Sequence, residues 1–318
     1  MQETGACCST RRQRPGTASA GTAVPAGAGS HRIEQCPIPA GAFAMGDGHG
    51  DGRLQDGEQP VHRVELDAFT IDATTVTNED FAAFAAGTGY RTDAETFGSS
   101  AVFHRVVAAE HTDVLGRDAR APWWWDVRGA DWRHPEGPLS DIDGRNDHPV
   151  VHVSWNDAQA YCRWAGRALP TEAQWERAAR GGLTAARYPW GDEAPGSGGA
   201  WRANIWQGRF PDHNTAEDGW VTTAPVRTYR PNGLGLWQSV GNVWEWCADS
   251  HDPRAYARRA PGPVANPVCT AETGARVLRG GSYLCHDSYC NRYRNAARSA
   301  NTADSSMANA GFRTVAAG

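Results

Sequence analysis

The stretch at residues 121–138, APWWWDVRGADWRHPEGP, places the tightest limit on how this chain can fold. Its four tryptophans, Trp123, Trp124, Trp125 and Trp132, follow neither the period of an amphipathic helix nor the alternation of a half-buried strand. Large rings without a period must fill irregular spaces or line a surface. The chain contains 14 Trp and 36 Gly in 318 residues, so we expect frequent backbone bends and little regular helix.

Two interpretations of these indole rings remain open. Exposed rings could line a cleft that holds an extended peptide or a sugar, and residues 97–104, FGSSAVFH, have a similar mixed character. The rings could equally be packing residues in a loop-rich fold.

The first 30 residues differ in composition from the rest of the chain. They are a mixture of Gly, Ala, Ser, Thr and Pro with no apolar segment that could serve as the core of a signal peptide. We expect residues 1–30 to be a disordered tail and residues 31–318 to form a single domain. A cytoplasmic location is the matching expectation, in which the eight cysteines are reduced, catalytic or metal-binding rather than disulfide-bonded.

The charge balance limits the classes of partner. The formal net charge is −5 and the isoelectric point is near 6.1, which argues against nucleic acid or an anionic membrane surface. No apolar run approaches the roughly 20 residues that a bilayer span requires. We therefore expect no nucleic-acid partner and no membrane partner.

Helical patterns occupy only three short segments, each with capping residues. They are predicted from Thr77 to Gly87, from Asn156 or Asp157 to Gly166, and from Thr171, whose capping box uses Gln174.

Alternating patterns predict strands at 36–45, 61–71 and 148–155. His148 and His152 are four positions apart, so they would share one face of the last of these strands. They could form half of a metal site, or they could be a structural pair, because no third ligand is nearby in the sequence.

Residues 279–298, RGGSYLCHDSYCNRYRNAAR, contain two cysteines five positions apart, Cys285 and Cys290. Thiolates at this spacing can bind a soft ion such as Cu(I), pair with each other, or attack a disulfide. A core role or a structural disulfide is the alternative, because free cysteine is among the most buried residue types. Positive charge lowers the pKa of a nearby thiol, and four arginines flank the pair: Arg279, Arg292, Arg294 and Arg298.

Two further segments combine oxygen-donor side chains with Gly and Pro. They are residues 204–220, NIWQGRFPDHNTAEDGW, and residues 236–249, LWQSVGNVWEWCAD. Oxygen atoms spread over an irregular backbone suit Ca2+, which accepts six to eight such ligands with loose geometry. Both segments could instead be acidic surface loops, since no EF-hand pattern is present.

Taken together, these motifs resemble the formylglycine-generating enzymes, also called sulfatase-modifying factors. The likeness runs from about residue 38 to residue 313. GNVWEW and LPTEAQWE are shared by a wider superfamily, whereas CHDSYCNRYR, with both cysteines, is similar to the catalytic members. The resemblance implies a single α/β (α+β) domain of irregular, C-type lectin-like architecture, low in regular secondary structure.

The resemblance also implies an activity. Members of this family oxidise the cysteine of a Cys-X-Pro-X-Arg sequence, in an unfolded sulfatase polypeptide, to Cα-formylglycine with O2 and a thiol reductant. By this likeness Cys285 and Cys290 would bind Cu(I), and the substrate thiolate would be the third sulfur ligand.

The family likeness assigns further residues by position. Those expected at the active centre beside Cys285 and Cys290 are Ser282, His286 and Tyr289. Those expected to line the peptide groove are Ser99, Ser100, Trp123, Trp124, Trp132 and Asn309. A first Ca2+ site would use Asn204, Ile205, Asp218 and Trp220. A second would use Gln238, Gly241, Val243 and Glu245.

Departures from the family pattern fit a non-secreted member. Disulfide partners found in secretory-pathway relatives are replaced here by Ala179, Asn295 and Thr314, and Gln238 stands where Asn is common. Two other functions remain as alternatives. One is a non-catalytic peptide- or sugar-binding module of the same fold, and the other is an iron-dependent sulfoxide synthase, for which only His148 and His152 are candidate iron ligands.

Overall fold

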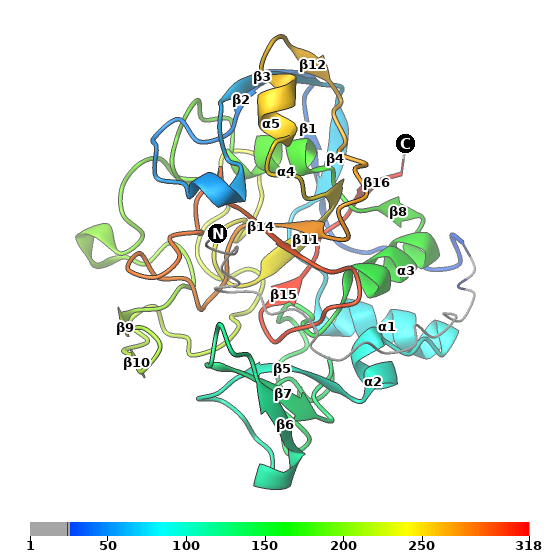
Figure 1. The fold of residues 1–318 in the computed structure, drawn as a ribbon. Coiled ribbons are helices and arrows are strands. Elements are labelled where there is room, and N and C mark those ends of the chain that lie inside the picture. Colours follow the sequence, from blue (N-terminus) through cyan, green and yellow to red (C-terminus); the bar gives the residue numbers. More distant parts are fainter. Residues whose placement is uncertain (1–23, 25, 318) are drawn as a thin grey trace.

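Short strands in several small sheets, joined by long irregular connections, make up the structure (Figure 1). The computed structural model describes residues 24 and 26–317. Its helices are α1 (Asn78–Thr88), α2 (Asp93–Phe97), α3 (Trp155–Ala165), α4 (Glu172–Ala179) and α5 (Ala255–Arg259), with short 3-10 turns η1 (Leu54–Asp56), η2 (His111–Asp113) and η3 (Ser197–Gly199). The expected mixed α/β fold with little regular secondary structure is confirmed.

Two four-stranded sheets occupy the centre. One has the order β1 (Gln35–Ile38), β4 (Phe69–Asp72), β16 (Val315–Ala316), β8 (Arg167–Ala168). The other has the order β14 (Arg298–Asn301), β13 (Arg276–Arg279), β11 (Trp244–Ser250), β15 (Ala310–Gly311).

Three smaller sheets surround them. They are β12 (Val264–Ala265), β3 (His62–Leu66), β2 (Gly41–Met45); β5 (Ser99–Phe103), β7 (Trp124–Arg128), β6 (Val114–Arg117); and the hairpin β9 (Gly208–Arg209), β10 (His213–Asn214). The β5–β7–β6 sheet lies at the opposite end of the molecule from α5 and β12 (Figure 1).

The helix caps follow the sequence signals closely. Thr77 and Thr171 each accept a backbone N–H three residues on, and both capping boxes are complete. The predicted end of α1 at Gly87 is wrong, because the helix continues to Thr88 and Gly89 supplies the left-handed residue with φ 66°. The cap of α3 is Ser154 rather than Asn156 or Asp157.

Three strand predictions need correction. The segment 36–45 forms β1 and β2, which belong to different sheets, and the segment 61–71 forms β3 and β4. The segment 148–155 forms no strand: Pro149 makes an isolated bridge to Thr77, and His152 has a positive φ of 57°.

The tryptophan-rich stretch does contain a strand, β7. The end of the segment 236–249, from Trp244 on, belongs to the strand β11, most of which is buried, rather than to a surface loop.

The predicted disordered tail lies mostly outside the described residues. At its end, however, the backbone N–H groups of Gly27 and Gly29 donate to the carbonyls of Arg163 and Trp164, at 2.9 and 3.0 Å. These contacts place residues 27–29 against the C-terminal turn of α3. In the part of the chain that is described, no helix is both long and apolar enough to cross a membrane.

Aromatic side chains fill the largest core. Phe84 of α1 packs edge-on against Tyr161 of α3, with ring centroids 5.6 Å apart, and Phe81 stacks parallel to the same ring at 6.2 Å. Trp244 and Trp246 of β11 are fully buried in the same cluster. The central strands are therefore enclosed by rings, as the tryptophan content led us to expect.

The N-terminus of α3 shares a buried carboxylate with α2. Asp157 accepts hydrogen bonds from Tyr90 Oη (3.0 Å), from the N–H of Asp93 (3.0 Å) and from the N–H of Ser154 (2.8 Å). Burial, assisted by the negative charge of Asp93, raises the pKa of Asp157 to about 7.

This buried acid predicts a pH-dependent stability. Between pH 4 and 7 the unfolded chain releases the Asp157 proton while the folded chain retains it, so the free energy of unfolding should fall as pH rises. Relative to an Asp157→Asn variant, the wild type should lose about 2 kcal/mol between pH 5 and 8, measured by urea unfolding. An unchanged difference between the two proteins across this range would contradict the assignment.

Candidate active site

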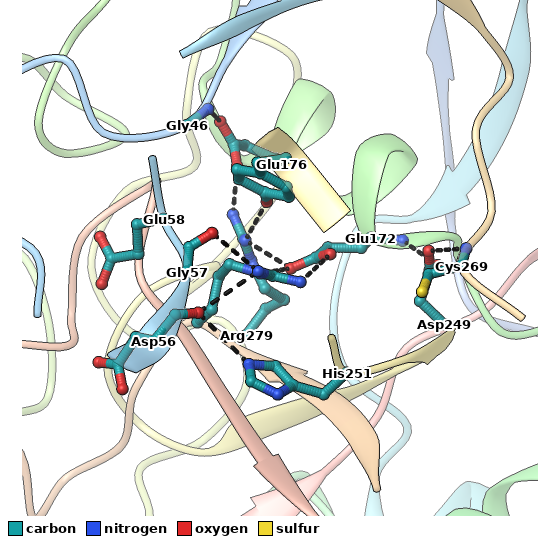
Figure 2. Close-up of polar contacts among 12 residues, drawn as sticks. Gly46, Asp56, Gly57, Glu58, Glu172, Glu176, Asp249, His251, Cys269 and Arg279 are labelled. Carbon is teal, nitrogen blue, oxygen red and sulfur yellow. Dashed lines mark hydrogen bonds and ion pairs between the residues drawn. The ribbon is translucent and has the colours of Figure 1, made fainter. Parts of the chain in front are cut away.

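The two cysteines lie in a loop, residues 280–297, that connects β13 to β14. These strands are antiparallel, and the last residue of one, Arg279, pairs in register with the first residue of the other, Arg298. Both guanidinium groups are fully buried and share Glu172 of α4: Arg279 Nη1 lies 3.0 Å and Arg298 Nε 2.5 Å from Glu172 Oε1. Arg279 also donates to Glu176 at 2.5 Å (Figure 2). The base of the loop is therefore held by ion pairs to one helix.

Two more arginines anchor the C-terminal half of the loop. Arg292 makes a bidentate pair with Asp56 of η1, at 2.7 and 2.8 Å, and Arg294 makes one with Glu58, at 2.9 and 3.0 Å. Figure 2 shows Asp56 and Glu58 beside the Arg279 cluster. All four flanking arginines are therefore neutralised by carboxylates. The expectation that they act on the thiols as free positive charges is corrected: they fix the loop.

The thiols themselves are buried and form no disulfide. Cys285 is 0% and Cys290 3% exposed. Cys285 Sγ accepts a hydrogen bond from the N–H of Ser282 at 3.4 Å, an interaction that favours the thiolate. Both cysteines lie close enough to Tyr293 to contribute to its raised pKa, after the larger effect of burial. The structure thus brings both sulfur-bearing side chains to one buried region.

Ser282 and Asn309 belong to the same region. Ser282 Oγ accepts from Asn309 Nδ2 at 2.8 Å and from the N–H of Leu284 at 3.3 Å. His286 lies farther out, half-buried, with Nδ1 2.7 Å from Ser288 Oγ. The loop therefore presents Ser282 beside Cys285 and places His286 toward solvent.

Three rings, which we call the aromatic cluster, cover the loop next to Cys290. Tyr289 stacks on Phe210 with centroids 4.2 Å apart and planes at 10°. Trp123 meets both edge-on, at 5.0 Å from Tyr289 and 5.2 Å from Phe210. Phe210 comes from the turn between β9 and β10 and was missed by sequence reasoning, because no local period marks it. All three rings are half-buried.

The other expected groove residues lie deeper. Trp124 and Trp132 are 1% and 2% exposed and belong to the core, so their rings are not presented to a peptide. Ser99 is also buried, and Ser100 Oγ is 2.7 Å from both Ser306 Oγ and His152 Nδ1. Of the expected tryptophans, Trp123 is the one positioned to meet a peptide.

The two histidines do not form a pair. His148 Nδ1 lies 3.0 Å from Thr223 Oγ1, whereas His152 contacts Ser100 and the carbonyl of Pro135. Burial lowers the pKa of His152 to about 4, so it is neutral near pH 7. Across the described residues no group of three or more His, Cys, Asp or Glu side chains could hold a metal ion. The proposed half-site at His148 and His152 is therefore wrong.

The residues expected at the first calcium site do converge. Asp218 Oδ2 accepts from the N–H of Ile205 and its Oδ1 from the N–H of Trp220, both at 3.0 Å. Burial raises the pKa of Asp218, and Asn204 Oδ1 is buried without a hydrogen-bond partner. A buried amide oxygen without a donor can act as a cation ligand. However, Gln207 Nε2 donates to Asp218 Oδ2 at 2.7 Å and also to the carbonyl of Ile205, so a cation would have to displace this amide.

The second set fits less completely. Gln238 Oε1 is buried without a partner, and Gly241 has φ 75° with space for no Cβ, since that atom would lie 2.6 Å from the carbonyl oxygen of Asn204. However, both oxygens of Glu245 accept hydrogen bonds from Arg313, and one also accepts from Trp175. Val243 is buried immediately before β11. Glu245 would have to share its carboxylate with any cation.

Comparison with known proteins decides the family. The model of the sulfatase-modifying factor enzyme 1-like domain matches residues 23–317. This chain belongs to that family. A formylglycine-generating enzyme from Streptomyces coelicolor is 62% identical over 299 residues, covering 94% of each chain. The protein is therefore an enzyme of the sulfatase-modifying-factor family, and the resemblance noted from its sequence is confirmed.

Two more distant proteins are also similar to this chain. A relative from Bos taurus named as an inactive Cα-formylglycine-generating enzyme 2 is 43% identical over 285 residues, covering 88% of this chain and 87% of its own. The solved structure of PvdO from Pseudomonas aeruginosa, at 21% identity and a TM-score of 0.65, shares the fold and covers 94% of this chain and 99% of that chain. Because the first of these is named as inactive, overall similarity does not by itself establish catalysis, and the site residues must be considered.

The shared carboxylate at the base of the loop predicts a large effect of one substitution. Glu172→Gln leaves the buried guanidinium groups of Arg279 and Arg298 without their common counter-charge, so unfolding should become easier by about 3–5 kcal/mol in urea titrations. The matched control is Glu65→Gln, which breaks an exposed pair with Arg63 and should change stability by less than about 1 kcal/mol. Equal effects of the two substitutions would show that the buried pairs do not hold the loop.

Proposed function

We propose that this enzyme oxidises the cysteine of a Cys-X-Pro-X-Arg sequence in sulfatase polypeptides to Cα-formylglycine, using Cu(I), O2 and a thiol reductant. The observation that carries the proposal is the pair Cys285 and Cys290: two unbridged thiols in one rigid loop, beside the aromatic cluster. A non-catalytic module of the same fold has no need for such a pair.

The residues present fit a copper ion. Two cysteines on one loop offer soft anionic ligands, and the N–H of Ser282 stabilises negative charge on Cys285. When bound, Cu(I) would supply one-electron chemistry with O2 and bind the substrate thiolate as a third sulfur ligand. Two protein sulfurs leave room for that third ligand, whereas a closed four-ligand site would not.

The atom balance explains why a reductant is needed. Converting the substrate's –CH2–SH group to an aldehyde with one O2 releases one molecule of hydrogen sulfide and one of water only if two hydrogen atoms are added from outside. A thiol reductant supplies them by forming a disulfide. The remaining cysteines of the described residues are buried, which does not favour them as the source of these hydrogen atoms, and we propose a separate thiol molecule as the reductant.

The chain's own residues would bind and orient the substrate. Trp123 and Tyr289 offer half-buried rings on which an extended peptide can lie, and Phe210 fixes the plane of Tyr289. Ser282, held by Asn309, lies next to Cys285 and can position a proton near the reacting sulfur. The deep burial of both thiols limits access of water to the site.

The client is proposed to be an unfolded sulfatase in the cytoplasm. A motif cysteine can reach buried thiols only if its own backbone is extended and accessible, which a folded sulfatase would not permit. The six cysteines of the described residues are all free, which suits a reducing compartment.

Calcium is proposed as a structural ion at the first site. The support is the buried Asn204 Oδ1, which has no donor, and the buried Asp218 carboxylate, which contacts the backbone of Ile205 and Trp220. The cation would replace the amide of Gln207, which now donates to Asp218. A second site would use Gln238, Gly241, Val243 and Glu245. We propose that it binds Ca2+ more weakly, because Arg313 already donates hydrogen bonds to both carboxylate oxygens of Glu245.

The activity has a direct test. Copper-loaded enzyme with O2 and a thiol reductant should convert a CxPxR peptide to an aldehyde, detected by hydrazide capture and mass spectrometry. Cys285→Ser and Cys290→Ser should each abolish conversion and Cu(I) binding without loss of fold. Cys269→Ser, a buried cysteine in a separate core cluster, should retain both. A copper-loaded wild type that yields no aldehyde would refute the proposed activity.

Calcium binding should appear as thermal stabilisation. Adding Ca2+ to the chelator-treated enzyme should raise Tm, and Asp218→Asn should abolish most of the increase because it removes the charge that favours the cation. Gln238→Ala tests the second site and should have the smaller effect. A Tm that does not respond to Ca2+ in the wild type would exclude both sites.

A further inference from the structure

One end of the β5–β7–β6 sheet carries three exposed arginines, Arg105, Arg117 and Arg120, which we call the arginine edge. Arg117 ends β6 and pairs in register with Trp125. Arg105 follows the end of β5, where Phe103 pairs with Trp124, and Arg120 lies in the turn that leads from β6 to β7. The three positions therefore gather where all three strands start or finish.

These arginines differ from the others near the site. Arg292 and Arg294 are buried and paired, whereas no carboxylate of the described residues lies within ion-pair distance of Arg105, Arg117 or Arg120. Arg209, in the β9–β10 hairpin, forms an ion pair with Asp212 at 3.6 Å. In a chain of net charge −5, an exposed cluster of unpaired guanidinium groups is a local exception.

The arginine edge adjoins the aromatic cluster. Arg117 lies 4.4 Å above the ring of Trp125, which follows Trp123 by two residues, at most about 7 Å along the backbone. Trp123 in turn contacts Tyr289, the residue before Cys290. His104 lies between these groups: burial lowers its pKa, and the charges of Arg105 and Arg117 act in the same direction.

The distances set the reach of a bound peptide. From Tyr289 to Trp123 is 5.0 Å between ring centroids, the step to Trp125 adds at most about 7 Å, and Arg117 lies a further 4.4 Å from the Trp125 ring. An extended chain rises about 3.3 Å per residue, so side chains about four to six residues from a cysteine held near Cys290 would meet the arginine edge.

We propose that the arginine edge binds acidic side chains of the client polypeptide on the N-terminal side of its reactive cysteine. This inference rests on the proposed function. The motif's own arginine lies four residues C-terminal to the cysteine, and positive charge on both partners would repel it from the arginine edge. Acidic residues placed four to six positions before the cysteine carry the complementary charge, so the edge selects the direction in which the peptide lies.

Binding of non-reactive peptides tests this without turnover. Fluorescent peptides with CxPxR changed to SxPxR would carry two Asp residues on the N-terminal side, two on the C-terminal side, or Asn in both places. Fluorescence anisotropy at about 0.02 M ionic strength should show the N-terminal acidic peptide binding about 5-fold more tightly than the neutral one, and about 0.3 M salt should remove most of this preference. The C-terminal acidic peptide should show no such gain.

Charge reversal supplies the variant test. Arg117→Glu with Arg120→Glu should invert the preference, so that the neutral peptide binds more tightly, and Arg105→Glu alone should reduce it. Arg117→Gln, which keeps a long side chain but removes one of the three charges, should reduce the preference by less than the double reversal does. The matched control is Arg32→Glu, an exposed residue three positions before β1 and outside the β5–β7–β6 sheet, which should keep the full preference.

The outcomes separate this inference from the proposed function. Equal binding of the acidic and neutral peptides, or a preference that survives charge reversal, overturns the inference while the enzyme still binds the motif. Failure of every SxPxR peptide to bind, together with failure of CxPxR conversion, overturns the proposed function and the inference with it.

Discussion

The sharing of Glu172 between two buried arginines is the interaction on which the rest of the site depends. Arg279 and Arg298 face each other across the end of β13 and β14, and like charges at this distance would separate the strands without a counter-charge. Burial alone would raise the pKa of Glu172, but the two guanidinium groups outweigh it and hold the pKa at about 2. The carboxylate therefore stays ionised, and the loop between the strands begins and ends at a fixed point.

Because the loop is fixed by ion pairs, Cys285 and Cys290 can remain free thiols in the buried interior without a disulfide to hold the backbone. Burying an ion pair removes both charges from water, and well-packed apolar residues often give equal or greater stability. The contribution of these ion pairs is therefore to fix the position of the loop. Arg292 and Arg294 add two further ion pairs from the loop, one to Asp56 of η1 and one to Glu58, two residues later. With its backbone held at four places, the loop does not need a disulfide to define where Cys285 and Cys290 lie, and both sulfurs remain available for chemistry.

Local signals predicted local structure well, and long-range burial much less well. Capping at Thr77 and Thr171 depends on three neighbouring residues, so the sequence was sufficient for it. The burial of Trp124 and Glu245 depends on strands that are distant in the chain, and no window of sequence contains both partners. The role of the flanking arginines was misjudged for the same reason, since Asp56 lies 236 positions before Arg292. The resemblance to a family assigned residues from distant segments to one site, which the periodicity of the sequence could not do.

The cation chemistry of the chain has one further consequence. The sequence contains 31 basic residues and no lysine, so every ion pair described above uses a guanidinium group. A lysine amine condenses with an aldehyde to form a Schiff base, whereas guanidinium remains protonated and unreactive near neutral pH. An enzyme whose relatives are named for making an aldehyde thus has no side-chain amine with which its own product could become covalently attached.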